Sequence, residues 1–306
     1  MKIATMATGG IGGYLAVRLA TAGHQVATIA RGPHLEAIRT NGLKLEGYDG
    51  DQMIEPWIAT DDPQDVGPVD AIIFGVKGDA TRSAGEACKP MLGEDTIVIP
   101  FLNGVEASDI LKEVLPERNV GNGVAQVSTT ISAPGVIRQT GEFNRFIFAE
   151  RDSSPSERVD ALRKAIDDAG SSAPATDDIV RDLWFKFVLF SAGSGITAAA
   201  RCTIGDITGN PHLTALYKAA VAEAAALARA RNIGLPDTIE EDVWQTALAF
   251  PPTMKASTAL DLEKGLPLEI DWITGAVLRL SEEAGLDAPV SRTLYALLSP
   301  YRNGRP

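Results

Sequence analysis

The chain has 306 residues and a formal net charge of −12, and this acidic balance argues against a general nucleic-acid surface. Hydrophobic residues make up 45% and charged residues 22%, as in soluble globular proteins, and no run approaches the ~18 apolar residues that span a bilayer. The two cysteines, Cys88 and Cys202, lie far apart, which predicts reduced thiols and no metal site. No secretory signal follows Met1, so we expect a cytoplasmic protein.

The first half of the chain alternates strand-like and helix-like segments. Apolar strand patterns cover residues 2–6, 25–30, 71–75 and 96–100, and two further β-rich stretches cover 41–47 and 136–150. Between the first two strands, residues 11–22 have helical spacing and Gly23 is the predicted stop. This alternation predicts βαβ units and a parallel sheet.

The second half of the chain has a different character. Residues 168–178 read DAGSSAPATDD, and this small, acidic, proline-containing stretch predicts a linker. Helical patterns follow at 179–197, 213–232, 238–249, 254–264 and 269–284. We therefore predict an α/β domain over 1–170 and an all-helical domain over 178–306. An exposed apolar face on the helical domain would allow a homodimer, but the sequence leaves the oligomeric state open.

A glycine-rich turn is predicted after the first strand, and it comprises Ala7, Thr8, Gly9, Gly10, Ile11 and Gly12. The dinucleotide fingerprint is G-x-G-x-x-G, and here Ala7 replaces the first glycine. Small residues let the backbone approach a pyrophosphate, while the helix N-terminus supplies N–H groups and a positive dipole end. The strand before and the helix after favour a dinucleotide site over a purely structural turn. A short-chain dehydrogenase is excluded because no Tyr-x-x-x-Lys pair exists.

Arg31 directly follows the second predicted strand, about 20 residues after the glycines, where NAD-selective sites usually place Asp or Glu. An acidic side chain at this point accepts a hydrogen bond from the ribose 2′-hydroxyl. A guanidinium would instead pair with a 2′-phosphate, so the sequence favours NADPH over NADH. The alternative is a solvated surface arginine.

The proton donor for a reduction is best sought outside the histidines. His24, His34 and His212 are the only three, and none has a catalytic-looking setting. Lys186 lies in the motif LWFKF, inside a very apolar predicted helix. Either its ammonium group reaches water, or it serves a site, where desolvation would lower its pKa and improve it as a proton donor.

With these motifs in order, the chain resembles the ketopantoate reductase (2-dehydropantoate 2-reductase) family nearly from end to end. The resemblance rests on the glycine turn, FGVKG around Lys77, FLNGVE around Asn103, LWFKF around Lys186, and STALDLEKGLPLEID from Ser257 to Asp271. It implies a doubly wound Rossmann-type domain followed by an all-helical domain, with the active site in the cleft between them. It also implies NADPH-dependent reduction of a 2-oxo acid at C2, most simply ketopantoate to pantoate in pantothenate biosynthesis.

The resemblance also implies roles for individual residues. Lys186 matches the catalytic lysine that donates to the carbonyl oxygen, and Glu269 matches the acid that hydrogen-bonds the substrate. Asn103 matches an asparagine near the nicotinamide and the substrate, and Ser257 matches a substrate-binding serine. The family's cofactor-binding cations are matched by Arg31 and Lys77.

The residues themselves partly support these roles. Glu269 follows Gly265 and Pro267, which predicts a place in the first turn of a helix, where the dipole favours a carboxylate. Without the family, Glu269 could be an ordinary helix-start acid. Asn103 and Gly104 could likewise be only a turn.

Three departures from the family pattern concern the substrate. Family asparagines four and eight residues after the lysine are replaced by Phe190 and Ser194, and a third asparagine is replaced by Met254. Offsets of four and eight keep one helical face, so we expect Phe190 and Ser194 to line the substrate side. One alternative is therefore a related NADPH-dependent reductase of a more apolar 2-oxo acid. A non-catalytic dinucleotide-binding regulator is a further alternative, although Lys186 and Glu269 argue against it.

Overall fold

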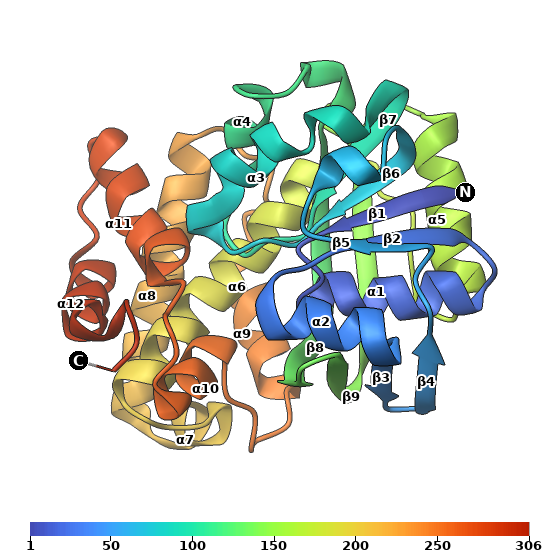
Figure 1. Cartoon of the computed structure of the whole chain (residues 1–306). Coiled ribbons are helices and arrows are strands. Elements are labelled where there is room, and N and C mark those ends of the chain that lie inside the picture. Colours follow the sequence, from blue (N-terminus) through green and yellow to red (C-terminus); the bar gives the residue numbers. More distant parts are fainter. Residues whose placement is uncertain (306) are drawn as a thin grey trace. The chain divides into compact units, whose positions relative to one another are not determined.

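The computed structural model describes residues 1–305, which divide into two compact units (Figure 1). Unit 1 comprises Met1–Leu102 and Glu106–Ile179. Unit 2 comprises Asn103–Val105 and the described chain from Val180 onward. The short segment Asn103–Val105 therefore belongs to unit 2, although the chain on both sides of it belongs to unit 1.

Unit 1 contains a five-stranded sheet whose paired strands are all parallel. Its strand order is β5-β2-β1-β6-β7, and the strands are β1 (Lys2–Met6), β2 (Gln25–Ile29), β5 (Ile58–Thr60), β6 (Val69–Phe74) and β7 (Leu92–Pro100). The predicted strands at 2–6, 25–30, 71–75 and 96–100 are confirmed as β1, β2, β6 and β7. Read along the sheet as third, second, first, fourth and fifth strand, this order matches the first five strands of the Rossmann order 3-2-1-4-5-6.

A second, four-stranded sheet also belongs to unit 1. Its order is β4-β3-β9-β8, and its strands are β3 (Leu43–Gly47), β4 (Gly50–Ile54), β8 (Gly121–Ala133) and β9 (Val136–Glu150). The β-rich stretches at 41–47 and 136–150 are confirmed as β3 and β9. The short turn Pro134–Gly135 joins β8 to β9, and Gly135 has a φ of +74°.

Helix α1 (Gly10–Thr21) packs between the two sheets (Figure 1). The eight consecutive residues 12–19 are all buried, so the helix has no solvent-facing side over two turns. Gly23 follows it with a φ of +90°, as the predicted stop requires. The other helices of unit 1 are α2 (Gly32–Asn41), α3 (Thr81–Ala87), α4 (Ala107–Lys112) and α5 (Glu157–Asp168), with 3-10 turns at Pro63–Asp65, Gly78–Ala80, Lys89–Met91 and Glu117–Asn119.

Unit 2 is helical throughout its described elements. They are α6 (Ile179–Ala199), α7 (Ile204–Gly209), α8 (Pro211–Ala230), α9 (Ile239–Ala249), α10 (Ser257–Lys264), α11 (Thr274–Glu283) and α12 (Pro289–Leu298), with 3-10 turns at Ile270–Trp272 and Ser299–Tyr301. Apolar residues of α6, α8, α9, α11 and α12 share one core. Glu223 of α8 accepts hydrogen bonds from the N–H groups of Val290 and Ser291, which caps α12.

The helix predicted over 269–284 is wrong at its start. Glu269 precedes a single 3-10 turn, and α11 begins only at Thr274. The Asp271 carboxylate accepts a hydrogen bond from the Tyr295 hydroxyl at 2.6 Å and pairs with Arg302 at 3.4 Å. These tertiary contacts accompany a turn that the local helical spacing does not reveal. The predicted helix at 254–264 likewise begins later, at Ser257.

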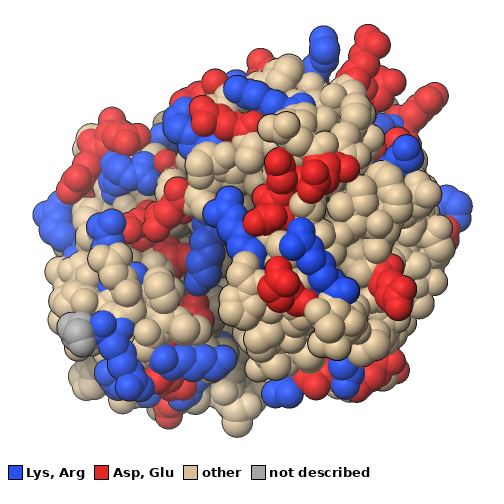
Figure 2. All heavy atoms as spheres, in the orientation of Figure 1, with Lys and Arg blue, Asp and Glu red and all other residues tan. Residues whose placement is uncertain are grey.

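The surface charge and the apolar character of the helices bear on whether the protein could bind nucleic acid or span a membrane. Acidic and basic side chains are interspersed on the face shown in Figure 2, so the negative net charge does not form one continuous patch there. Among residues 1–305, none of the helices combines the length and apolar character that a bilayer-spanning segment needs.

Candidate active site

The glycine turn follows the carboxyl end of β1 and leads directly into α1. Ala7 has a φ of +65°, the left-handed conformation that favours glycine, so it occupies the place of the fingerprint's first glycine at the expense of strain. The Thr8 side chain is buried and bonds back to the protein, to the Thr5 hydroxyl and the Ile29 carbonyl. Gly9 is the N-cap of α1, and no atom lies within 4 Å of the position that a Cβ would occupy there.

The other glycines of the cluster meet the protein's own atoms. A Cβ on Gly10 would lie 2.6 Å from the Thr129 carbonyl oxygen, and a Cβ on Gly12 would lie 2.4 Å from the Ala7 carbonyl oxygen. On Gly13 it would lie 2.6 Å from the Ile137 side chain. Gly10 and Gly13 therefore let α1 approach β8 and β9, and Gly12 lets it approach the turn. Only Gly9 leaves open space for a ligand.

Arg31 and Lys77 follow β2 and β6, the two strands that flank β1. Because the carboxyl ends of parallel neighbours meet at one edge of a sheet, both cations lie at the edge that holds the glycine turn. Arg31 is exposed at the N-cap of α2, and Lys77 is exposed at the start of the Gly78–Ala80 turn. Ile11, the remaining residue predicted to contact the cofactor, lies in the first turn of α1 and packs partly against the unit 1 core.

Lys186 lies on α6 with buried residues around it. Trp184, Phe187 and Val188 belong to the unit 2 core, while the lysine itself is half-buried. Burial lowers the pKa of Lys186 from 10.5 to about 8, and the negative charge of Glu269 opposes part of this shift. Its ammonium nitrogen is 5.4 Å from the centre of the Phe190 ring, one helical turn further on.

Asn103 joins Lys186 to Glu269. Its Oδ1 accepts a hydrogen bond from Lys186 Nζ at 3.3 Å, and its Nδ2 donates one to Glu269 Oε2 at 3.4 Å. An ammonium group can only donate and a carboxylate can only accept, so these two partners allow one orientation of the amide. The three side chains form a connected donor–acceptor chain, called the Lys186 group below.

Gly104 explains how Asn103 reaches this position. It has a φ of +91°, and a Cβ there would lie 2.5 Å from the Trp272 carbonyl oxygen. The Asn103–Gly104 turn therefore sits directly on the 3-10 turn that follows Glu269. The dipeptide was a visible turn signal in the sequence, but its contact with a segment about 170 residues away was not.

Glu269 is held by the loop around it and not by a helix N-terminus. Leu268 and Ile270 on either side are buried, and the Leu268 N–H donates to the Arg302 carbonyl at 2.9 Å. Gly265, with a φ of +67°, caps α10, and its carbonyl accepts from the Arg305 N–H. The helix start predicted for Glu269 is therefore only a single 3-10 turn, and the loop that carries Glu269 is anchored by backbone bonds to the C-terminal segment.

The structure does not bring the other predicted substrate residues into the Lys186 group through any described hydrogen bond. Ser194 is 2% exposed on α6, and Ser257 is exposed at the start of α10. Met254, which replaces a family asparagine, packs its side chain against the unit 2 core, as does the ring of Phe190. Of these four residues, Phe190 alone has a described contact with Lys186.

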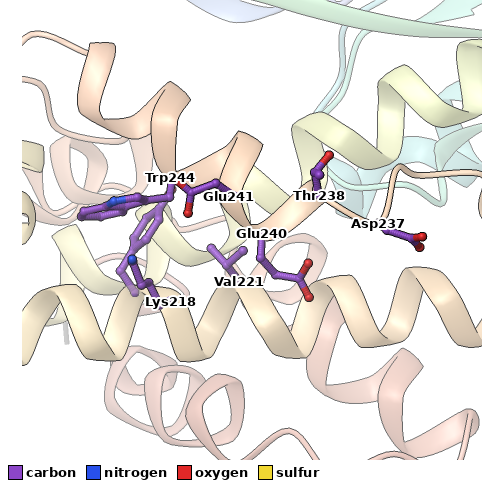
Figure 3. A pocket seen from close by; sticks show the side chains of 8 residues that line it. Lys218, Val221, Asp237, Thr238, Glu240, Glu241 and Trp244 are labelled. Atoms are coloured by element: carbon purple, nitrogen blue, oxygen red, sulfur yellow. The ribbon is translucent and has the colours of Figure 1, made fainter.

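A separate pocket of about 310 Å³ lies between α8 and α9 (Figure 3). Lys218 and Trp244 lie at one end of it, with the ammonium nitrogen 4.7 Å from the ring centre, and Asp237 and Thr238 lie at the other. The Lys186 group does not line it. The carboxylates that line this pocket are those of Asp237, Glu240 and Glu241, and they would repel an anionic substrate such as an oxo acid.

Known proteins resemble the whole chain. The family model described as ketopantoate reductase PanE/ApbA matches residues 3–153, and the model of its C-terminal domain matches residues 178–302. A 2-dehydropantoate 2-reductase of Mesorhizobium japonicum is 31% identical, with 97% of each chain covered. The solved PanE/ApbA family ketopantoate reductase of Ralstonia eutropha is 32% identical, with a TM-score of 0.89 and coverage of 99% of this chain and 98% of the other.

A third match shows the fold alone. The ternary structure of D-mandelate dehydrogenase with NADH and anilino(oxo)acetate has a TM-score of 0.88 and covers 99% of this chain and 98% of the other, but is only 21% identical. The two family models together span the parallel-sheet unit and the helical unit, so the α/β fold class followed by a helical region is confirmed. This chain belongs to the ketopantoate reductase PanE/ApbA family of oxidoreductases.

Proposed function

We propose that this protein reduces a 2-oxo acid to the 2-hydroxy acid with NADPH, and that ketopantoate is the first candidate substrate. The Lys186 group is the observation that supports a reductase most directly. A lysine with a pKa of about 8 is still mostly protonated at neutral pH, yet it releases a proton far more readily than an ordinary lysine. It is suited to protonate a carbonyl oxygen as that oxygen gains negative charge.

The three side chains of the group have distinct roles in this proposal. Lys186 donates the proton to the substrate oxygen, and Asn103 holds the ammonium group through its Oδ1. Glu269 orients Asn103 and keeps Lys186 charged, because its carboxylate favours the protonated amine. Its second oxygen is available to accept a hydrogen bond from a substrate hydroxyl.

The residues of the glycine turn fit a dinucleotide. The open space at Gly9 permits close approach of a phosphate, and the first N–H groups of α1 have no acceptor within the helix. Gly9, Gly10 and Ile11 would face the pyrophosphate with their backbone, while Arg31 and Lys77 would supply positive charge. A nicotinamide cofactor supplies the hydride when bound.

Arg31 supports NADPH in particular. It is exposed at the N-cap of α2, and among residues 1–305 no carboxylate pairs with its guanidinium. A 2′-phosphate would offer the charge-assisted partner that a ribose hydroxyl cannot. The preference of the wild-type protein for NADPH over NADH tests this choice.

A second candidate substrate is a 2-oxo acid with a plain aliphatic or aromatic tail, and Phe190 is the observation that favours it. Its ring lies against the Lys186 ammonium group at a position where the family pattern has an asparagine. A phenyl ring can neither donate nor accept the hydrogen bonds of an amide, so the hydroxyl of ketopantoate would lose a partner, at roughly 1–3 kcal/mol if buried.

The test is NADPH oxidation by the purified protein with ketopantoate and a panel of apolar 2-oxo acids. Turnover of at least one of them, abolished or strongly reduced in Lys186→Met, is the expected result. If Phe190 selects the substrate, the wild type has a higher kcat/KM for an apolar oxo acid than for ketopantoate. Phe190→Asn should then reduce or reverse this difference in kcat/KM. If the wild type prefers ketopantoate and Phe190→Asn keeps that preference, the Phe190 ring only packs against its neighbours and does not select the substrate. NADPH binding without turnover of any oxo acid would instead favour a regulatory protein.

A further inference from the structure

His34 lies in the first turn of α2 and contacts two backbone segments of unit 1. Its Nε2 is 2.8 Å from the Thr8 carbonyl oxygen in the glycine turn, and its Nδ1 is 3.0 Å from the Gly135 nitrogen in the β8–β9 turn. A carbonyl can only accept and a backbone N–H can only donate. The partners therefore select one neutral tautomer, with the proton on Nε2 and a bare Nδ1.

The neutral state agrees with the surroundings of the ring. Burial lowers the pKa of His34, and the hydrogen bond to Thr8 offsets only part of this effect. The imidazole is consequently neutral at neutral pH, as an accepting Nδ1 requires. Gly135 also lies against α2 at Ala37, whose Cβ would be 3.0 Å from a Cβ on Gly135. The hydrogen bond between His34 and Gly135 thus lies where α2 packs against the β8–β9 turn.

The bond to Thr8 has a consequence for Gly9. The described chain contains no cis peptide bond, so the C=O of Thr8 and the N–H of Gly9 point in opposite directions across one planar unit. With the carbonyl directed to His34, the Gly9 N–H is directed away from it. Gly9 is the N-cap of α1 and the one glycine of the cluster with open space around it.

We propose that His34 is a positioning residue that fixes the Thr8–Gly9 peptide for a dinucleotide phosphate. It acts through the backbone of the turn and touches neither the reacting atoms nor the substrate. Since Arg31 precedes it by three residues at the N-cap of the same helix, the bond also sets α2 and its arginine relative to the turn. The assignment rests on the NADPH site proposed above.

Three substitutions separate the two hydrogen bonds. His34→Gln places an amide N–H where Nε2 stood and can keep the Thr8 bond, whereas His34→Asn places an acceptor where Nδ1 stood and can keep only the Gly135 bond. His34→Ala keeps neither. We expect the Kd for NADPH to rise about tenfold in the Asn and Ala variants and to stay within about threefold in the Gln variant. The kcat at saturating NADPH and the KM for the oxo acid should not change.

A purely structural role would not separate Gln from Asn in this way. The proposal is overturned if the Gln variant binds NADPH no more tightly than the Ala variant, or if the Asn variant binds like wild type. Thermal unfolding of each variant shows that the comparison is made on folded protein.

A second readout does not need the cofactor. Nitrogen NMR of histidine-labelled wild-type protein should show protonated Nε2 and unprotonated Nδ1 for His34, identified by its loss in His34→Gln. The opposite tautomer overturns the proposal whether or not a dinucleotide binds. Failure of the wild type to bind NADPH overturns the proposed cofactor and this role with it, whereas tight wild-type binding with no separation among the variants overturns this role alone.

Discussion

The glycine turn of unit 1 and the Lys186 group of unit 2 are organised by different kinds of atoms. In the turn, backbone atoms approach one another so closely that a single methyl group has no room at Gly10 or Gly12. In the Lys186 group, an ammonium, an amide and a carboxylate contact one another at their ends. Substitutions that add atoms should therefore disrupt the glycine turn, whereas substitutions that remove a polar or charged group should disrupt the Lys186 group.

The largest effect is expected at the centre of the Lys186 group. Lys186→Met keeps the length of the side chain and removes the amine, so kcat should fall roughly 10²-fold or more, as for the loss of a positioned acid. Affinity for NADPH, measured by titration, should change much less. The matched control is Lys218→Met, an exposed lysine of α8 outside the group, which should retain kcat. Near-normal turnover in Lys186→Met would mean that another group donates the proton.

The pH dependence of the wild type gives the next largest effect. The folded-state pKa of Lys186 is lowered to about 8, so the donor is fully protonated well below that pH and loses its proton as the pH rises through it. The kcat/KM should be level on the acid side and fall roughly tenfold per pH unit on the alkaline side. Glu269→Gln removes a charge that raises this pKa, so the fall should move to lower pH. An alkaline limb near the ordinary lysine value would contradict the assignment.

Arg31 is one of two exposed cations at the edge of the sheet that holds the glycine turn, and the one expected to select the cofactor. Arg31→Ala should remove most of the preference for NADPH over NADH, on the order of 1.5–3 kcal/mol or roughly 10- to 150-fold in relative Kd. Arg39→Ala, further along α2 and paired with Glu36, is the control and should leave the ratio unchanged. Equal affinity of the wild type for both cofactors would refute the selective role.

Two glycines of the same turn should respond differently to the same substitution. Gly12→Ala places a methyl group against the Ala7 carbonyl and should lower the free energy of unfolding by about 1–3 kcal/mol. Gly9→Ala meets open space and an ordinary φ of −84°, so it should leave stability nearly unchanged while weakening NADPH binding. Chemical denaturation and cofactor titration of both variants make the comparison. Equal losses of stability would show that the open space at Gly9 has been misassigned.

The smallest effect concerns backbone strain. Ala7 has a φ of +65°, which disfavours a residue with a Cβ by roughly 1 kcal/mol, so Ala7→Gly should raise the free energy of unfolding by about that amount. Denaturant melts of the two proteins measure the difference. A lower stability in Ala7→Gly would mean that the alanine methyl group makes favourable contacts that outweigh the strain.

Much of the fold could be predicted because the spacing of apolar residues along the chain indicates which segments form strands and which form helices. Strand β1 and helix α1 follow from an apolar run, helical spacing and a glycine stop, and the helical second half follows from the same 3.6-residue pattern. The candidate site was predictable only as motifs. LWFKF identified Lys186 as an unusual lysine, and its spacing to Phe190 placed the two on one helical face, where the structure puts them in contact.

By itself, then, the sequence determined the parallel-sheet and helical classes, the glycine turn after β1, and the family. Only the tertiary structure decided which glycine leaves room for a ligand, that Glu269 lies before a 3-10 turn, and that Asn103 joins unit 2. The physical reason is distance along the chain. Asn103 bonds to residues 83 and 166 positions away, and contacts of that separation depend on how the elements pack, which no local spacing records.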